Sequence, residues 1–458
     1  MIAHRSSVVI LGGGPGGYEA ALVAARTGAS VTVIDRDGLG GACVLTDCVP
    51  SKALVSTAAF VGGLSSGSAL GVAGTEAARA DLSAVNSRIL ALAQSQSTDI
   101  GVHLRAAGVR VIAGVGTLLA PGCVRAESAQ GEVEDLRADV VLVATGSTPR
   151  TMPTAEPDGE RILTWKQIYA LDALPDKLVV VGSGVTGAEL AHAYVGLGAQ
   201  VTLVSSRDRV LPGEDADAAT VIEDVFRRDG MEVLGRSRMA SVERTATGVR
   251  VTLVDGRVVE GSHALLAVGS LPQTAGLGLE EAGIELTPSG HIEVDSVSRT
   301  SVRGVYAAGD CTGVLPLASV AAMQGRIAMW HALGDAVAPL KLSRVSATIF
   351  TMPEIATVGI TQQQIDEGLT EANVDMLPLA TNARAKMDSF HDGFVKVFSR
   401  KGSGTVAGGV VVAPRASELI FPLALAVENH LNVDQVASTF TIYPSMSGSI
   451  AEAARRLH

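Results

Sequence analysis

The sequence predicts an α/β protein of several domains, built on two similar βαβ units and followed by a separate α+β domain. The first observation is a duplication, because residues 8–35 align without a gap on residues 178–205. The second is that each copy shows a buried strand, a glycine turn, an alanine-rich helix and a β-branched strand. The third is the length of 458 residues, which exceeds what one compact core normally accommodates.

Composition narrows the class of protein. Hydrophobic residues make up 47% of the chain and charged residues 18%, which is typical of a globular protein and not of a disordered one. The net charge of −11 gives no electrostatic reason to expect nucleic acid or an anionic membrane surface as a partner. No run of about eighteen uninterrupted apolar residues is present, and the start of the chain lacks signal-peptide features, so we expect no membrane span and a cytoplasmic location.

The glycine turn of the first copy carries chemistry. Gly12, Gly14 and Gly17 lie between the strand and the helix. The first glycine permits the tight turn, the second lets a pyrophosphate approach, and the third lets helix and strand pack closely. The phosphates then lie at the positive end of the helix dipole. Asp35, at the end of the second strand, is placed to accept hydrogen bonds from a ribose. Two such copies in full context predict two Rossmann-like nucleotide-binding domains.

The second copy differs at the ribose position. Its glycines are Gly182, Gly184 and Gly187. Where Asp35 is expected the chain has Ser205, followed by Ser206, Arg207 and Arg209. An acidic group there would repel a 2′-phosphate, whereas hydroxyl and guanidinium groups bind one. We therefore expect NADPH as the donor, with NADH tolerated. The alternative is that both arginines only solvate a surface loop.

Domain boundaries are expected near three prolines, Pro153, Pro272 and Pro339. Residues 1–152 and 272–340 then form the first nucleotide-binding domain, and residues 153–271 form the second, inserted domain. Residues 341–458 read as strands followed by helices without a glycine fingerprint. This terminal domain is a candidate subunit interface.

Two cysteines lie in the segment GGACVLTDCVPSKAL, which follows the first βαβ unit. Cys43 and Cys48 lie in a glycine-rich entry to a predicted helix. Four cysteines in a chain of this length do not make a disulfide scaffold, so any disulfide here is expected to be redox-active. The residues alone leave two possibilities, buried thiols or a bridge. Cys123 and Cys311 have no partner at recognisable spacing and are expected to be inert buried thiols.

Several motifs together give the chain a family resemblance. They are GGGPGG, the Cys-x4-Cys-x-Pro-Ser-Lys segment, Ala144-Thr145-Gly146, GSGVTGAE, Gly309-Asp310 and FTMPEIATVG. In this order they resemble the flavoprotein disulfide reductase family, which includes dihydrolipoamide dehydrogenase, glutathione reductase and mercuric reductase. The resemblance runs nearly end to end. It implies FAD in the first domain, NAD(P)H in the second, and a homodimer formed through the C-terminal α+β dimerisation domain.

The resemblance also implies roles for single residues. Cys48 would be the thiol nearest the flavin and Cys43 the thiol that faces substrate. Lys52 and Glu189 match a charged pair beside the flavin, and Asp310 would bind the ribityl chain. The remaining cofactor-binding positions are Gly12, Gly14, Gly17, Asp35, Ala144, Thr145, Gly146, Gly309, Gly182, Gly184, Gly187, Ser205, Ser206, Arg207 and Gly269. No metal site is predicted.

The tail departs from the family pattern. Disulfide reductases of this family end with His-Pro-Thr-x-Ser-Glu, whereas this chain has Tyr443 in place of the histidine and Gly448 in place of the glutamate. A phenol, with a typical pKa of about 10, is a poor general base at neutral pH. Losing general acid–base help costs about 10²–10⁴ in rate. His430 and His458 lack the required spacing to a carboxylate, so neither is expected to replace it.

These features favour transfer of electrons from NAD(P)H through FAD to a small acceptor. The likeness is greatest to NAD(P)H quinone reductases of the dihydrolipoamide-dehydrogenase-like branch, which lack the terminal dyad. The two cysteines leave their own role open. Tyr443 either donates a proton or hydrogen bond to a quinone oxygen or only packs in the subunit interface.

Four alternatives stay open. A soluble pyridine nucleotide transhydrogenase also has a tyrosine at the position of Tyr443, but this chain keeps the second cysteine. A residual disulfide reductase of the dihydrolipoamide dehydrogenase type would use Cys43 and Cys48. Mercuric reductase requires a terminal cysteine pair, and no cysteine follows Cys311. A flavin redox sensor with negligible turnover is the alternative that is not an enzyme.

Overall fold

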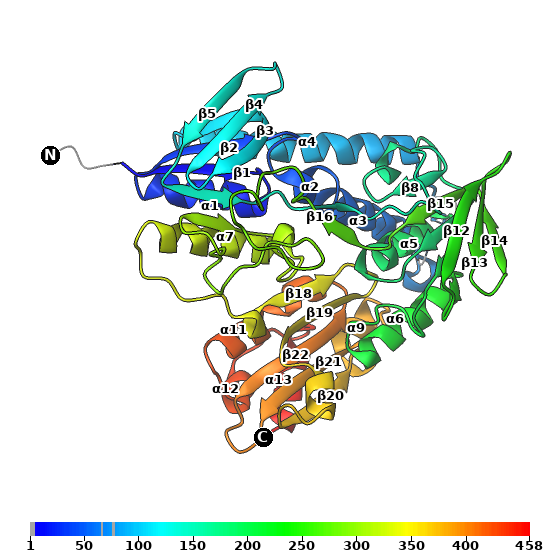
Figure 1. Cartoon of the computed structure of the whole chain (residues 1–458). Helices are drawn as coiled ribbons and strands as arrows, with labels where there is room; N and C mark the ends of the chain where they lie inside the picture. Colours follow the sequence, from blue (N-terminus) through cyan, green and yellow to red (C-terminus); the bar gives the residue numbers. More distant parts are fainter. Residues whose placement is uncertain (1–4, 66, 76–77) are drawn as a thin grey trace. The chain divides into compact units, whose positions relative to one another are not determined.

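The computed structural model describes residues 5–65, 67–75 and 78–458, and Figure 1 shows the path of the chain. The first four residues of the predicted first domain lie outside this description. The chain forms two compact units. Unit 1 contains residues 1–51, 87–150 and 269–341, and unit 2 contains residues 52–86, 151–268 and 342–458.

Unit 1 is built on a seven-stranded sheet. In spatial order its strands are β17 (Val305–Ala307), β6 (Val140–Val143), β1 (Ser7–Leu11), β2 (Ser30–Asp35), β3 (Arg110–Ala120), β4 (Cys123–Ser128) and β5 (Val133–Arg137). The strands from β17 to β3 run parallel, and β4 and β5 add antiparallel strands. Because β1 lies between β2 and β6, its carboxyl end is the switch point at which such sheets bind ligands.

Strand β1 is buried on both faces of the sheet, as its apolar residues require. Val8 and Ile10 of β1 pack into one core, whereas Val9 and Leu11 pack into another. Helices α1 (Pro15–Arg26) and α7 (Ala318–Ala332) lie together on the first of these faces (Figure 1). They meet at Gly325, where a Cβ would lie 2.0 Å from the Gly16 carbonyl oxygen. Only glycine permits this approach.

Unit 2 contains the second parallel sheet. Its strands, in spatial order, are β11 (Glu232–Leu234), β10 (Gln200–Val204), β9 (Lys177–Val181), β15 (His263–Leu266) and β8 (Ile162–Thr164). Helix α5 (Val185–Leu197) follows β9, and α6 (Ala216–Arg228) precedes β11. A three-stranded antiparallel sheet of β12 (Met239–Arg244), β13 (Val249–Leu253) and β14 (Val258–Gly261) is added before β15. Strand β9 occupies the central position that β1 has in unit 1.

The terminal part of unit 2 is an antiparallel sheet with helices. Its strands are β18 (Ser346–Ile349), β19 (Glu354–Gly359), β22 (Val406–Ala413), β21 (Phe394–Arg400) and β20 (Ala372–Pro378). Helices α11 (Phe421–Glu428), α12 (Val433–Ser438) and α13 (Gly448–Arg456) complete the fold. Leu423 and Ile450 of these helices share a core with Val395 and Val411 of the strands. The predicted class, two Rossmann-like domains and a C-terminal α+β domain, is confirmed.

One helical stretch, residues Gly41–Leu64, is long and apolar enough to cross a membrane by length and composition alone. The absence of an uninterrupted apolar run does not exclude such a helix, because an average over a window tolerates the charges of Asp47 and Lys52. A core helix of a soluble protein passes the same test, and one third of this window, 33%, is buried.

Candidate functional site

The first glycine turn is closed toward the protein and open at its middle glycine. Gly12 has φ of +100°, and a Cβ there would lie 2.3 Å from the Ala144 carbonyl oxygen. A Cβ on Gly17 would lie 1.9 Å from the Gly12 carbonyl oxygen, whereas one on Gly14 would meet nothing within 4 Å. Gly14 is the N-cap of α1. Open space at the N-terminus of a helix fits a pyrophosphate.

The Asp35 carboxylate holds the loop after β2. It accepts backbone hydrogen bonds from Gly13 (2.6 Å), Gly38 (2.6 Å) and Asp37 (2.9 Å). Burial raises the pKa of Asp35, and these three hydrogen bonds oppose the rise. Because a carboxylate has about four acceptor positions, one remains for a ribose hydroxyl.

Two glycines that the sequence did not single out complete this turn. Gly40 has φ of +92°, and a Cβ on Gly41 would lie 2.9 Å from the Gly14 Cα. The start of helix α2 (Gly41–Leu45) therefore lies against the first turn. The run GLGG was the signal that could have located this approach.

Asp310 lies in a short 3₁₀ segment after β17, where the predicted ribityl contact was placed. The Ser147 hydroxyl donates to its carboxylate at 2.9 Å. Burial raises the pKa of Asp310, and the Ser147 hydrogen bond opposes the rise. A desolvated carboxylate with a single donor among the described residues fits the hydroxyl groups of a polyol chain.

Two glutamines that no sequence motif marks support this part of the site. Gln273 donates to the Thr145 carbonyl at 2.9 Å, and the Thr145 hydroxyl donates to the Gln273 carbonyl at 2.6 Å. The buried Gln324 accepts the Gly309 N–H at 2.8 Å. The predicted Ala144-Thr145-Gly146 and Gly309-Asp310 segments are thus held by side chains distant in sequence.

The two predicted cysteines lie on successive helices. Cys43 lies in α2, and Cys48 is the first residue of α3 (Cys48–Ser65). Both side chains are partly buried. Lys52 follows Cys48 by one turn of α3 and therefore lies on the same face of that helix.

Lys52 and Glu189 form an ion pair in unit 2. The Lys52 ammonium lies 2.7 Å from a Glu189 carboxylate oxygen, with 29% and 2% of the two side chains exposed. The other Glu189 oxygen accepts the Phe350 N–H at 2.8 Å. The ammonium also lies 5.0 Å from the centre of the Phe350 ring, a cation–π distance. These contacts fix a positive charge in one position.

His192, which no sequence motif marks, lies one turn after Glu189 on α5. The side chain is buried, and its Nδ1 accepts the Met352 N–H at 3.2 Å. Its Nε2 lies 3.2 Å from Asp229, which fits the tautomer with the proton on Nε2. Glu189 and His192 together hold residues 350–352 against α5.

The second glycine turn repeats the first. Gly182 has φ of +111°, and its Cβ would lie 2.2 Å from the Ala267 carbonyl oxygen. A Cβ on Gly187 would lie 1.9 Å from the Gly182 carbonyl oxygen, and one on Gly184 would meet nothing within 4 Å. Gly269, two residues after Ala267, has φ of +100°. This turn also leaves room at the N-terminus of its helix, α5.

The ribose end of this second site is held by serines. Ser205 is fully buried, and its hydroxyl lies 2.7 Å from the Ser183 hydroxyl and accepts the Arg207 N–H at 3.1 Å. The Ser206 and Arg207 side chains are exposed. The predicted residues lie together, and Ser205 is already bonded within its own turn.

The tail segment is exposed. Tyr443 is 86% exposed and is joined to Pro444 by a cis peptide bond. Gly448 begins α13, and a Cβ there would meet nothing closer than 3.7 Å. His458 lacks the family's spacing to a glutamate, as expected, but its ring lies 2.6 Å from Asp434. That pair is on the surface, with 78% of the His458 side chain exposed.

The other two cysteines are buried, as expected. Cys123 is 7% exposed and Cys311 is fully buried. Burial raises the pKa of Cys311 to about 11, so this thiol is protonated at neutral pH. Among the described residues, no group of three or more histidine, cysteine or acidic side chains could hold a metal ion.

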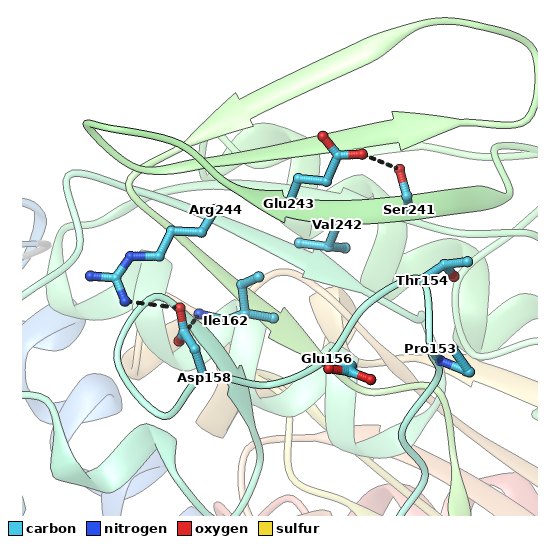
Figure 2. A pocket seen from close by; sticks show the side chains of 9 residues that line it. All are labelled: Pro153, Thr154, Glu156, Asp158, Ile162, Ser241, Val242, Glu243 and Arg244. Atoms are coloured by element: carbon cyan, nitrogen blue, oxygen red, sulfur yellow. Dashed lines mark hydrogen bonds and ion pairs between the residues drawn. The ribbon is translucent and has the colours of Figure 1, made fainter.

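A surface cavity of about 490 Å³ lies in unit 2 between residues 153–162 and β12. Figure 2 shows Arg244 beside Asp158 at its edge, 3.2 Å apart, and Ser241 donating to Glu243. Asp158 also accepts the backbone N–H groups of residues 160–162. Burial opposes these bonds, yet they and Arg244 hold the pKa of Asp158 below its usual range. The cavity is lined by none of the predicted site residues, and Asp158 and Arg244 at its edge neutralise each other.

Comparison with known proteins agrees with this geometry. The family model described as pyridine nucleotide-disulphide oxidoreductase matches residues 6–325, and the model of the family's dimerisation domain matches residues 345–454. A Mycobacterium tuberculosis protein named NAD(P)H dehydrogenase (quinone) is 57% identical over 98% of this chain and 93% of its own length. Dihydrolipoyl dehydrogenase 2 of Haloarcula marismortui is 34% identical over 99% of this chain and 97% of its own length.

Solved structures show the same fold. The crystal structure of LpdA from Mycobacterium tuberculosis has a TM-score of 0.95 and 56% identity, covering 99% of this chain and all of the other, 100%. The flavoprotein disulfide reductase RclA from Escherichia coli, at 23% identity, has a TM-score of 0.87 over 98% of this chain and 99% of its own, which shows the fold alone.

The two glycine turns, each open at the N-terminus of a helix, fit FAD in unit 1 and NAD(P)H in unit 2, the cofactors this family uses. The matched residues cover both nucleotide-binding domains and the terminal domain. This chain is an oxidoreductase and belongs to the pyridine nucleotide-disulphide oxidoreductase family.

Proposed function

We propose that the chain is an FAD-dependent NAD(P)H:quinone oxidoreductase that prefers NADPH and passes electrons to a small quinone-type acceptor. The carrying observation is that the charged pair Lys52–Glu189 is present, whereas Tyr443 occupies the position of the imidazole needed for dithiol exchange. The Mycobacterium tuberculosis relative named NAD(P)H dehydrogenase (quinone) supports this acceptor class.

The residues proposed to hold FAD lie in unit 1. Gly12, Gly14 and Gly17 would accept the pyrophosphate at α1, Asp35 would bind the ribose, and Asp310 would bind the ribityl chain. Ala144, Thr145, Gly146 and Gly309 would line the same site. FAD, when bound, accepts two electrons from a nicotinamide and returns them to an acceptor.

Lys52, in unit 2, is proposed to supply a fixed positive charge for the reaction. Its ammonium is held by Glu189, whose second oxygen is occupied by the Phe350 N–H. Because Glu189 is almost fully buried, the pair cannot easily rearrange. A cation held in place in this way stabilises negative charge that develops beside it without reorganisation.

The second glycine turn, with Gly182, Gly184 and Gly187, is proposed to bind NADPH, and Gly269, three residues after β15, is proposed as a further contact. Ser206 and Arg207 would contact the 2′-phosphate, and Ser205 would hold their loop. We expect Arg207→Ala to raise the KM for NADPH about tenfold, the loss of one charge-assisted hydrogen bond, and to change the KM for NADH little. Steady-state kinetics with both donors measures this, and equal effects on both would contradict the assignment.

The C-terminal segment with Tyr443 is proposed to determine which class of electron acceptor the enzyme can reduce. Tyr443 lacks a general base's properties at neutral pH, so efficient disulfide exchange is not expected. A quinone needs no thiolate attack and can accept electrons directly. Tyr443 is then placed either to donate a hydrogen bond to a quinone oxygen or to pack against a second subunit.

We propose three domains: an FAD-binding domain of residues 1–152 and 272–340, an NAD(P)H-binding domain of residues 153–271, and a dimerisation domain of residues 341–458. The protein is proposed to form a homodimer through this last domain. The match to the dimerisation-domain model and the exposed Phe440, Ile442 and Tyr443 support it. We further propose that the enzyme is soluble and cytoplasmic, without a membrane span. The helical stretch Gly41–Leu64 would then be part of the folded protein.

A panel of acceptors tests the proposed function. The purified protein is mixed with NADPH and, separately, menadione, lipoamide, oxidised glutathione, thio-NAD or Hg(II), and the loss of NADPH is followed. Fast turnover on menadione alone is the expected result. Fast turnover on lipoamide or glutathione would contradict the interpretation of the tail, thio-NAD reduction would indicate a transhydrogenase, and no turnover would favour a redox sensor.

Residual disulfide reductase activity is the second candidate, because both Cys43 and Cys48 are retained. Under the proposed function Cys43→Ser keeps quinone turnover within about twofold, since electrons need not pass through sulfur. Abolished turnover in this variant would instead mean that electrons reach the acceptor through the cysteines.

A further inference from the structure

The arginines of the second nucleotide-binding domain divide into two groups. Among the described residues, six of the ten between positions 151 and 268 have a bonded guanidinium group: Arg161, Arg227, Arg228, Arg244, Arg250 and Arg257. Within the part of the chain that the structure describes, no hydrogen bond or ion pair involves the guanidinium groups of the other four, which are Arg207, Arg209, Arg236 and Arg238. These four follow strands β10 and β11, in the two loops at the carboxyl edge of the sheet.

Backbone hydrogen bonds join these two loops directly. The Arg236 N–H donates to the Arg207 carbonyl at 2.7 Å, and the Ser237 N–H donates to the Ser205 carbonyl at 2.7 Å. A Cβ on Gly235 would lie 3.1 Å from the Asp208 carbonyl oxygen. Arg236 is therefore the immediate neighbour of Arg207, although 29 positions separate them in the sequence.

The backbone of Arg236 is itself unusual. Its φ is +52°, a left-handed conformation that is unfavourable for an L-residue with a long side chain. The neighbouring bond to Arg207 holds the backbone in that conformation. Glycine would adopt this conformation without strain, so the backbone turn by itself does not call for an arginine at this position.

The charge of the two loops is strongly positive. Asp208 is the one carboxylate in residues 205–209 and 235–238, so these segments carry three net positive charges. Arg236 and Arg207 are both exposed. Two exposed arginines on hydrogen-bonded loops, with no partner for either guanidinium group among the described residues, suit a dianionic phosphate, which accepts charge-assisted hydrogen bonds from both.

We propose that Arg236 is a specificity-determining residue that binds the 2′-phosphate of NADPH together with Arg207. This inference rests on the proposed NADPH site and adds a second loop to it. Arg238 is assigned no such role, because its carbonyl accepts the Val254 N–H at 2.8 Å as the chain enters β12, and no backbone bond joins it to Arg207.

The test uses the FAD-loaded protein and measures binding without turnover. Adenosine 2′,5′-bisphosphate and 5′-AMP are titrated calorimetrically against the natural protein, Arg236→Gly, Arg236→Lys and Arg238→Ala. Arg236→Gly removes the guanidinium and suits the left-handed backbone, so folding is preserved. We expect it to weaken the bisphosphate about tenfold and to leave 5′-AMP unchanged, with Arg236→Lys intermediate and Arg238→Ala within about twofold.

Other outcomes separate this inference from the proposed function. Equal weakening by Arg236→Gly and Arg238→Ala would indicate a diffuse field and overturn the assignment, as would unchanged bisphosphate binding in Arg236→Gly. If the natural protein shows no preference for the bisphosphate over 5′-AMP, both the inference and the NADPH preference fail. Absence of quinone turnover, with the bisphosphate effect intact, would contradict the proposed acceptor and leave the role of Arg236 standing.

Discussion

The two βαβ units of this chain share one backbone plan and differ in a few side chains. The middle glycines have nearly the same conformation, with φ and ψ of −68° and −175° at Gly14 and −72° and −173° at Gly184. A Cβ on the third glycine would lie 1.9 Å from the carbonyl oxygen of the first glycine in each unit. The turn geometry is therefore set by backbone approach, independently of the nucleotide bound.

The differences occur at equivalent positions on the same plan. Asp35 of the first unit corresponds to Ser205, and Gly13, whose N–H bonds to Asp35, corresponds to Ser183. In the first unit the Asp35 carboxylate accepts a hydrogen bond from the backbone N–H of Gly13. In the second unit the Ser205 and Ser183 hydroxyls form a hydrogen bond with each other. The substitution of aspartate by serine thus comes with a compensating side chain at Ser183.

The first helix of each unit shows a second difference. Glu19 of α1 lies 3.1 Å from Arg326 in a partly exposed pair, whereas Glu189 of α5 is buried and holds Lys52 and the Phe350 N–H. The same residue type at the same position therefore serves packing in one unit and charge placement in the other. The glycines therefore determine the shared backbone of the two βαβ units. The three pairs of equivalent positions, 13 and 183, 19 and 189, and 35 and 205, account for the different functions of the units.

The largest expected effect is a difference in protein stability between alanine substitutions at the third and at the second glycine of each turn. Gly17→Ala and Gly187→Ala should each destabilise the protein by about 3 kcal/mol or more, because the added methyl group overlaps a backbone carbonyl. Gly14→Ala and Gly184→Ala should cost less than about 1 kcal/mol, because their conformation and surroundings accept a Cβ. Thermal and urea unfolding measure the difference.

Cofactor retention sharpens this prediction. We expect Gly14→Ala to lose FAD, seen in the visible absorbance of the purified protein, and Gly184→Ala to keep FAD while losing NADPH binding. If Gly184→Ala released FAD, or if the alanine variants of the second and third glycines were equally unstable, the separation of structural and binding glycines would be wrong.

The next largest effect compares the two equivalent glutamates. Glu189→Gln should slow reduction of the flavin by NADPH about 10–100-fold, because Lys52 loses the partner that fixes its charge. Glu19→Gln should stay within about twofold, since a partly exposed pair contributes little. Stopped-flow reduction of the two variants measures both rates, and similar rates would show that the charge of Lys52 needs no fixed partner.

A smaller effect tests whether the ribose positions can be exchanged. In the first unit a Cβ on Gly13 would lie 3.1 Å from the Asp35 carboxylate, so a carboxylate at 205 requires glycine at 183. Ser205→Asp alone should therefore destabilise the protein. Ser183→Gly combined with Ser205→Asp should recover stability and lower kcat/KM for NADPH about 10–100-fold relative to NADH, through repulsion of the 2′-phosphate.

The controls for the exchange are Ser183→Gly alone and the natural protein. The single glycine variant should keep the NADPH preference, because it introduces no charge. An unchanged donor preference in the double variant would mean that residue 205 does not face the ribose, and the preference would then rest on Arg207 and its neighbours.

The sequence predicts the parts of the site that depend on local backbone constraints. The glycine turns, the aspartate after β2 and the placement of Lys52 one turn after Cys48 follow from short motifs and spacing. The pairing of Lys52 with Glu189 was inferred from family resemblance, because 137 positions separate the two residues. Local pattern alone gave no reason to connect them.

The supporting contacts escaped prediction for the same reason. Ser147 and Asp310 are 163 positions apart, and Glu189 and Phe350 are 161 apart. Phe350 contributes a backbone N–H, which no residue type marks. His192 carries no motif, and its role depends on where residues 350–352 lie. The burial of the Ser205 hydroxyl likewise depends on Ser183, whose contact appears only when β9 and β10 are paired.

The smallest expected effect is a pH dependence that only the first unit should show. Burial raises the pKa of Asp35 despite three backbone hydrogen bonds, whereas Ser205 does not titrate. A raised folded-state pKa stabilises the protein below the ordinary carboxyl pKa of about 3.9, and this contribution is lost as pH rises through the folded-state pKa. The free energy of unfolding of the natural protein minus that of Asp35→Asn should therefore fall with rising pH and then level off. Urea unfolding over a pH series measures this slope, which does not depend on the constant cost of the substitution. A difference that grows with pH would mean that the hydrogen bonds to Gly13, Asp37 and Gly38 outweigh burial and that Asp35 is an ordinary stabilised carboxylate.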